Sequence, residues 1–222
     1  MRDMLIVLRN EWNSFLSSDR GLFIVYAVMI IGWGFLIATW RSYILFFAPF
    51  WLASFSVIIA ATFANSVFVS ERISGSLEIL LTCGISRSGI LCGKLAFIFI
   101  TTMIVGALCM GLAGVVRHLL FGAAAGANAI IGASGVAVYC GATFLTAASS
   151  AYFSVLLPNP RVLHFINLLI VIFLVCLHSI LTAFWPIPLF ALALLLLLIG
   201  TVFLFLAKKE FEGERITKSI IL

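Results

Sequence analysis

The sequence predicts an all-α membrane protein with six transmembrane helices in a single domain, residues 1–222. Hydrophobic residues make up 64% of the chain and charged residues 9%, and the mean hydropathy is +1.27. Apolar segments cross lipid as helices, because lipid offers no partner for unpaired backbone groups. A helix needs about 20 residues to span a hydrocarbon core of about 30 Å. Six such runs cover residues 22–40, 43–69, 95–116, 127–156, 162–184 and 189–207.

The 13 Lys and Arg residues indicate how the six spans are oriented. With six spans, only Arg41 and Arg117 fall on one side, and all eight acidic residues fall on the other. Because segments rich in Lys and Arg stay in the cytoplasm, we expect a multi-pass protein of the cell (inner) membrane with both termini cytoplasmic. The remaining basic residues, all on the cytoplasmic side, are Arg2, Arg9, Arg20, Arg72, Arg87, Lys94, Arg161, Lys208, Lys209, Arg215 and Lys218.

The composition argues against nucleic-acid binding and against a metal site. The net charge of +5 comes from basic residues that follow the ends of the spans, so they form no patch for nucleic acid. The five cysteines are odd in number and lack the spacing of metal ligands. We therefore expect the lipid bilayer as a partner, no nucleic acid, and no metal.

Residues 1–20 are expected to form an amphipathic helix in the cytoplasmic interface. Their apolar side chains recur every three or four residues, which places them along one helix face, with Trp12 at headgroup depth. A plain cytoplasmic extension of the first span is the alternative. The apolar residues are Met1, Met4, Leu5, Leu8, Trp12, Phe15 and Leu16.

The fourth run is rich in small residues, with Gly132 and Gly135 near its start. Small residues let neighbouring backbones approach closely, so we expect this span to pack centrally. The sequences LPNPR at 157–161 and WPIP at 185–188 predict turns, because a proline disfavours helix at the residue before it.

The chain lacks the groups that an enzyme needs. The stretch GISRSGILCGK differs from a phosphate-binding loop, because three residues instead of four separate Gly89 from Gly93 and a leucine follows Lys94. Paired acidic residues do not occur within a span. We predict that the chain is no enzyme by itself, has no catalytic residue and binds no cofactor.

Four polar residues within or near the spans are candidates for a substrate path: Asn65, His164, Asn167 and His178. Polar groups at membrane depth usually face protein or a cavity. His164 and His178 lie within roughly 40° of each other on one helix face, so a line along a transport path or a haem contact is one interpretation. The favoured interpretation is that His164 lies at the cytoplasmic interface and His178 bonds to a neighbouring helix.

A polar island at residues 71–93 separates the second and third spans. Ser74 or Ser76 can cap a helix start, Gly84 can end that helix in a left-handed conformation, and Ser86 can cap the next one. We expect a short cytoplasmic helix at the membrane face. It would either dock on a partner or lie against the base of the protein. Its central residues are Leu77, Glu78, Ile79, Leu80 and Leu81.

This island resembles the cytoplasmic signature of ABC type-2 export permeases. That family shows Glu-Arg, then a Gly-Thr/Ser-Leu-Glu-x-Leu-Leu core, a Ser-Arg turn, and Gly-Lys at the start of the third span. A proline that is frequent before the turn is absent, and TCGIS stands in its place. The matching residues are Glu71, Arg72, Gly75, Ser76, Leu77, Glu78, Leu80, Leu81, Ser86, Arg87, Gly93 and Lys94.

The resemblance implies a permease subunit of an ATP-driven exporter. The island would be the coupling helix that docks on two separate ATP-binding subunits, which hold ATP and Mg. A second permease copy, with the first and fifth spans at the interface, would complete the substrate path. Family members often have a re-entrant helix pair between the fifth and sixth spans. The alternatives are the B subunit of the haem exporter used in cytochrome c maturation and a non-transport membrane scaffold subunit.

Overall fold

The computed structural model describes residues 2–17, 20–39, 48–69, 85–121, 132–157, 160–185 and 187–212. Every regular element in these ranges is a helix, as the composition predicts. In chain order they are α1 (Arg2–Leu16), α2 (Arg20–Thr39), α3 (Ala48–Ala64), the π-helical turn η2 (Asn65–Val69), α6 (Arg87–Phe121), α7 (Ala133–Leu156), α8 (Pro160–Phe184) and α9 (Leu189–Glu212).

Five helices in the described ranges are long and apolar enough to cross a membrane. They contain the stretches Trp51–Phe68, Arg87–Leu120, Ala133–Leu156, Phe165–Thr182 and Leu189–Phe211. The apolar part of α2, Phe23–Thr39, is shorter. The helices follow the six predicted runs closely, except that α6 begins at Arg87 instead of residue 95 and continues for 35 residues.

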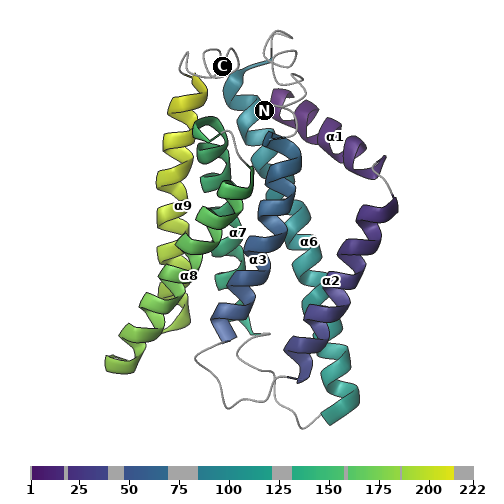
Figure 1. Cartoon of the computed structure of the whole chain (residues 1–222), viewed down its shortest axis with the longest axis vertical. Coiled ribbons are helices and arrows are strands. Elements are labelled where there is room, and N and C mark those ends of the chain that lie inside the picture. The colour runs from purple at the N-terminus through teal and green to yellow at the C-terminus, as the bar shows by residue number, and fades with distance from the viewer. Residues whose placement is uncertain are drawn as a thin grey trace.

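The helices form one bundle in which α1, the start of α6 and the described ends of η2 and α9 lie at the same end. Figure 1 shows α1, the start of α6, the end of η2 and the end of α9 at the top of the molecule. The end of α2, the start of α7 and the turn from α8 to α9 lie at the bottom. Arg117 belongs to the last turns of α6, at the bottom end of that helix.

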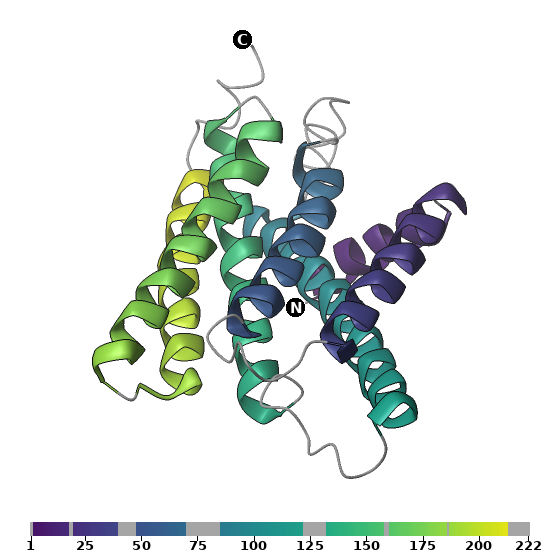
Figure 2. The ribbon, with the colours of Figure 1, turned by 60° about the horizontal axis from the view of Figure 1, so that its bottom comes forward.

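Helix α3 lies at the centre of the bundle. It contacts α6, α7 and α8, while α2 packs along α6, and α9 packs along α7 (Figure 2). One apolar core joins α3 to α1, α2 and α6 around Phe55 and Phe63. A second core joins α3 to α7, α8 and α9 around Leu145 and Leu196. The outer faces of α2, α8 and α9 leave large apolar side chains exposed, as a lipid-facing surface requires.

Glycine sets the spacing between α7 and α9. A Cβ added at Gly141 would lie 2.9 Å from the carbonyl oxygen of Ala193, and one at Gly200 would lie 2.7 Å from the ring of Phe144. The fourth span therefore approaches a neighbouring backbone closely at Gly141, and Gly135 is also buried on α7. Most of α7 is buried, as expected for a central helix.

The turns at both ends of α8 are short. Helix α8 begins at Pro160, where the missing N–H and the restricted φ of proline suit a first helical position. It continues to Phe184, and α9 begins at Leu189, so residues 185–188 make the whole connection. Four residues leave no room there for the re-entrant helix pair that the resemblance implies.

Candidate functional site

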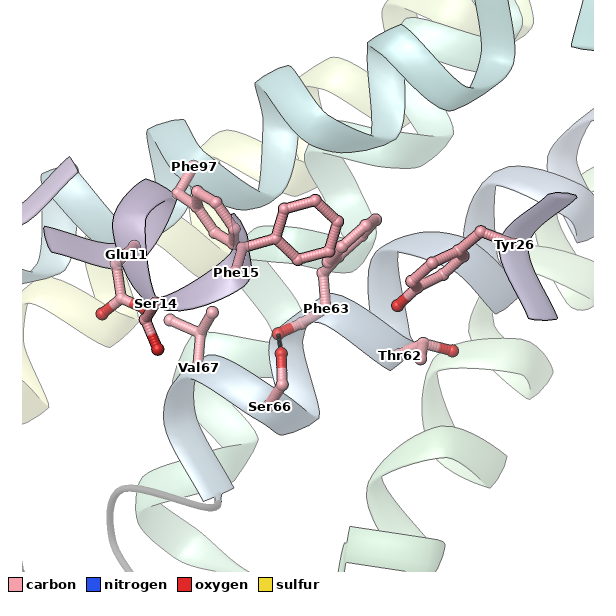
Figure 3. A pocket seen from close by; sticks show the side chains of 9 residues that line it. All are labelled: Glu11, Ser14, Phe15, Tyr26, Thr62, Phe63, Ser66, Val67 and Phe97. Atoms are coloured by element: carbon pink, nitrogen blue, oxygen red, sulfur yellow. Dashed lines mark hydrogen bonds between the residues drawn. The ribbon is translucent and has the colours of Figure 1, made fainter. Parts of the chain in front are cut away.

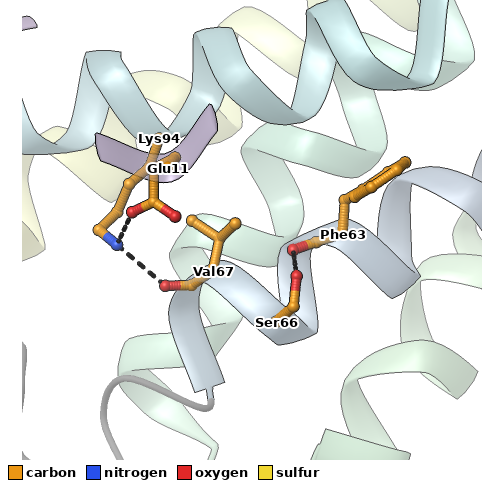
Figure 4. Close-up of polar contacts among 5 residues, drawn as sticks. All are labelled: Glu11, Phe63, Ser66, Val67 and Lys94. Atoms are coloured by element: carbon orange, nitrogen blue, oxygen red, sulfur yellow. Dashed lines mark hydrogen bonds and ion pairs between the residues drawn. The ribbon is translucent and has the colours of Figure 1, made fainter. Parts of the chain in front are cut away.

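The base of the bundle is organised around Lys94 on α6. Its Nζ donates a hydrogen bond to Oε1 of Glu11 on α1 at 2.8 Å and another to the backbone carbonyl of Val67 on η2 at 3.0 Å. Figure 4 shows the ammonium between the two acceptors. Lys94 is 0% exposed and Glu11 is 6% exposed. We call Glu11, Lys94 and the Val67 carbonyl the Lys94 clamp.

The third partner of the clamp is the backbone carbonyl of Val67, close to the end of η2. The last carbonyls of a helix have no intrahelical partner, and Val67 lies in the final turn of η2. A lysine at such an end satisfies the carbonyl and interacts favourably with the helix dipole. The ammonium also lies 5.9 Å from the centroid of the Phe68 ring, a cation–π distance. Lys94 therefore ties the end of the α3–η2 helix to α1 and α6.

Two glycines on α6 bring α1 close enough for the clamp. A Cβ added at Gly93 would lie 2.8 Å from Cβ of Val7 and 2.9 Å from the carbonyl oxygen of Met4. One added at Gly89 would lie 2.8 Å from Cβ of Asp3. The two glycines are four residues apart, so they form one smooth strip on which the backbone of α1 rests.

A second polar contact fixes the beginning of both helices. Ser86, the residue before α6, donates hydrogen bonds from Oγ at 2.7 Å and from its backbone N–H at 3.1 Å to Oδ2 of Asp3. The Ser86 carbonyl accepts the N–H of Ile90, which is the first bond of the helix. The predicted cap is thus at the helix start, but its hydroxyl binds α1. The side-chain and backbone hydrogen bonds from Ser86 lower the pKa of Asp3 below its ordinary 3.8.

An aromatic cluster fills the space beside the clamp. Phe15 on α1 lies between Phe63 and Phe97, with ring centroids 5.5 and 6.1 Å away, and Tyr26 stacks on Phe63 at 5.0 Å. A cavity of about 120 Å³ adjoins them and reaches Glu11, Ser14, Thr62 and Ser66 (Figure 3). The clamp thus has polar surroundings on one side and packed rings on the other.

The predicted apolar face of α1 is only partly the face that packs. Leu8, Trp12 and Phe15 lie against the bundle, as expected. Leu5 and Leu16, however, are 60% and 57% exposed. The helix is rotated so that Val7 and Glu11 are its buried residues, and Glu11 pairs with Lys94.

The Lys94 clamp joins three elements of the bundle through buried polar contacts. Removing one partner of a buried ion pair leaves the other charge uncompensated. The protein then loses about 3–5 kcal/mol of stability. The clamp therefore holds α1, α6 and η2 together as one unit. Within the described ranges no group of three or more His, Cys, Asp or Glu side chains gathers as a metal site would require.

Most of the predicted coupling residues lie outside the described residues. Arg87 is described, and it is the exposed first residue of α6. The connection from 70 to 84 leaves η2 at Val69 and returns before α6, so both of its ends adjoin the Lys94 clamp. The predicted residues outside the described ranges are Glu71, Arg72, Gly75, Ser76, Leu77, Glu78, Leu80 and Leu81.

Among the substrate-path candidates, Asn167 has the most complete environment. It is 1% exposed on α8. Its Nδ2 donates to Oγ of Ser150 at 2.7 Å, and its Oδ1 accepts from Oγ of Ser149 at 2.7 Å. Both serines are buried on α7. Within one copy of the chain, Asn167 therefore joins two helices.

The four substrate-path candidates lie on two elements, α8 and the start of η2. Asn65 is half-buried at the start of η2, directly after the last residue of α3. His178 is buried on α8, three turns beyond Asn167. His164 belongs to the first turns of α8, and its side chain is outside the described residues. Asn167 and His178 share one helix, and Asn65 lies on another.

Four residues of the site were not among the predicted site residues: Glu11, Gly89, Gly93 and Lys94. Two signals in the sequence point to them. Gly89 and Gly93 have the spacing at which small residues let helices touch. Lys94 is a lone charge at the head of an apolar run, where an unpaired charge is costly, so it requires a partner. Nothing local identifies that partner as Glu11.

Comparison with known proteins adds no relative to these observations. No protein-family model matches the chain, and no curated protein matches it.

Proposed function

We propose that this chain is the membrane-spanning permease subunit of an ATP-driven exporter of the ABC type-2 kind. In this proposal α2 is the first of six spans, and the end of the bundle that carries α1 faces the cytoplasm. Two copies form the substrate path. ATP and Mg bind to separate ATP-binding subunits, on which residues 71–93 dock.

The Lys94 clamp carries the proposal. A coupling segment must pass the movement of an ATPase to the spans without absorbing it in flexible joints. The segment 70–84 is bounded by η2 and α6, and Lys94 bonds the end of η2 to α6 directly. Glu11 adds α1 to the same buried unit. A push on the segment would therefore move α3, α6 and α1 together.

The charge distribution supports the cytoplasmic placement of this end. Ten basic residues besides Lys94 and all eight acidic residues adjoin it in the sequence. The opposite end has only Arg41 and Arg117. The bias of Lys and Arg toward one side is the usual determinant of orientation. The short connections at the opposite end leave no soluble domain there, so an energy source would have to bind at the α1 end.

The test is complex formation with an ATP-binding protein, which a gene adjacent to that of this chain would supply. The two proteins are co-expressed, purified and reconstituted, and ATP hydrolysis is measured with and without candidate substrates. Glu78→Lys and Leu80→Asp are expected to weaken the complex on the order of tenfold or more, because single interface anchors contribute that much. ATP hydrolysis stimulated by the permease should fall in parallel.

A matched charge reversal separates docking from a general effect of charge. Glu210→Lys makes the same change on α9, outside the 71–93 segment that is proposed to dock. It is expected to leave the complex intact. Full complex formation by Glu78→Lys and Leu80→Asp would contradict the proposal, and so would ATP hydrolysis by the purified chain alone.

A further inference from the structure

A second hollow lies at the other end of the bundle, on the outer surface of α6 and α7. It is an apolar groove of about 650 Å³, within the range of about 300–1,000 Å³ that is usual for sites of small ligands. A Cβ added at Gly111 or Gly114 would meet no atom within 4 Å, so the two glycines deepen the groove. Its lining residues are Ala107, Met110, Gly111, Gly114, Val115, His118, Leu119 and Val136.

Two polar residues of α6 lie in or next to this groove. His118 is its polar lining residue. Arg117, the next residue along α6, has a buried Nε with no hydrogen-bond partner among the residues that the structure describes. A buried donor left unsatisfied is costly, and more so in a charged group. The Nε of Arg117 therefore lacks an acceptor within the part of the chain that the structure describes.

The position of the groove along α6 corresponds to one leaflet of a bilayer. From Lys94 to Arg117 the helix advances 23 residues, a rise of about 35 Å. That is slightly more than a hydrocarbon core of about 30 Å. If the Lys94 clamp lies at one interface, Arg117 and His118 lie at headgroup depth on the other. The glycines and Met110 then lie within the acyl chains of that leaflet.

We propose that the groove binds an anionic phospholipid from the leaflet opposite the 70–84 segment. One acyl chain lies along Gly111 and Gly114. The phosphate accepts hydrogen bonds from the guanidinium of Arg117 and the imidazole of His118, both of which carry N–H donors. The inference rests on the membrane placement of α6 within the proposed function, and it does not depend on transport or on an ATPase.

A second copy of this chain fits the groove less well than a lipid does. A protein partner at this depth would have to bring a carboxylate to Arg117. All eight acidic residues of the sequence lie in residues 1–20, 71–78 and 210–214, which adjoin the opposite end of the bundle. Another copy with its spans in the same direction therefore cannot place an acid beside Arg117. An anionic lipid has its charge at the required depth.

The test uses the full chain in phosphatidylcholine vesicles that contain a photoreactive phosphatidylglycerol with the reactive group on an acyl chain. After irradiation, the labelled residues are mapped by mass spectrometry. We expect labelling within residues 107–119 and 136, with competition by unlabelled phosphatidylglycerol but not by added phosphatidylcholine. Arg117→Gln should weaken the competition about tenfold, the usual effect of losing a hydrogen bond to a charged group, and Arg117→Lys should retain most of it.

A substitution that fills the groove with a side chain tests the proposal more directly than the Arg117 variants do. Gly114→Leu, with Gly111→Leu as a second choice, places a side chain where the acyl chain would lie and should abolish the labelling. Gly32→Leu is the matched control, because a Cβ at Gly32 on α2 also meets no atom within 4 Å. Thermal unfolding of each variant establishes that it is folded.

Three results would overturn the inference. The first is equal labelling of residues 107–119 by a phosphatidylcholine analogue, which would indicate ordinary surrounding lipid. The second is unchanged labelling in both folded glycine variants. The third is efficient disulfide formation between Leu119→Cys chains in the vesicles, which would show that a second copy covers the groove. Complex formation with an ATPase would be unaffected by any of these results.

Discussion

The Nζ of Lys94 and Oε1 of Glu11 lie 2.8 Å apart in a buried ion pair that joins residues 83 positions apart in the chain. The pair makes α1 part of the base of the bundle. It contacts η2, after which the 70–84 segment begins, and α6, before which that segment ends. In the proposed function, movement of that segment would reach the spans through this pair.

Removing one charge of this pair should destabilise the protein strongly. Glu11→Gln preserves shape but leaves the buried ammonium of Lys94 without a counter-charge, so we expect a loss of about 3–5 kcal/mol in the free energy of unfolding. Denaturant unfolding of the purified protein in detergent measures it. A loss below about 1 kcal/mol would show that the pair is not buried in solution.

The double variant Glu11→Gln, Lys94→Met is the control for that prediction. A buried pair replaced by neutral side chains of similar volume is often nearly neutral in stability. The remaining loss comes from the Val67 carbonyl, which forfeits its hydrogen bond. We expect the double variant to be more stable than either single variant, so the coupling energy of the cycle should be favourable. Additive losses would argue against a direct interaction.

Gly93→Ala should displace α1 from α6. The added Cβ would lie 2.8 Å from Cβ of Val7 and 2.9 Å from a backbone oxygen, neither of which can move freely. Overpacking of this kind costs about 1–3 kcal/mol, and amide hydrogen exchange in α1 should become faster. Gly32→Ala, at an open helical position, should be neutral or slightly stabilising. Equal effects of the two substitutions would contradict the close contact at Gly93.

The contact between Asp3 and Ser86 should give the stability a dependence on acidic pH. Hydrogen bonds from Ser86 lower the pKa of Asp3 in the folded state below 3.8. The contribution is therefore fully present above the unfolded pKa and is lost as the pH falls through the folded pKa. Thermal unfolding of the wild type and Asp3→Asn between pH 3 and 7 measures it. The difference between them should be constant above about pH 5 and should shrink below pH 3.8.

Asn167→Leu should have a smaller effect than loss of the ion pair. The substitution removes the two bonds to Ser149 and Ser150 and leaves those hydroxyls buried. Interhelical hydrogen bonds within membranes contribute about 0.6 kcal/mol on average and rarely above about 1.7. We expect a loss of about 1 kcal/mol by unfolding in detergent, with Ser149→Ala as a milder companion. A loss comparable to that of Glu11→Gln would indicate a wider polar network around Asn167.

Local signals predicted the helices well. Five of the predicted runs contain helices long and apolar enough to span a membrane. The remaining run, 22–40, coincides with the shorter apolar stretch of α2. Helix α8 starts at Pro160, and α9 starts directly after Pro188. Hydropathy, helix length and proline restrictions act over a few residues, so they can be read without a fold.

The rotation of α1 could not be predicted in the same way. Its amphipathic pattern placed Leu5 and Leu16 with the other apolar residues, whereas the structure leaves them exposed and buries Glu11. The gain from burying Glu11 comes from Lys94, 83 residues away. The same holds for Asn167, whose partners on α7 are known only once α7 and α8 lie side by side.

The sequence by itself determined that the chain is helical, where its apolar helices run, and which segments gather at the charged end, because these properties depend on residues close together in the chain. Tertiary structure alone decided which charges are buried, which glycines touch another backbone, and which leave a groove open. Those outcomes depend on the geometry between helices, and a buried ion pair or a 2.8 Å Cβ approach exists only when two distant segments meet.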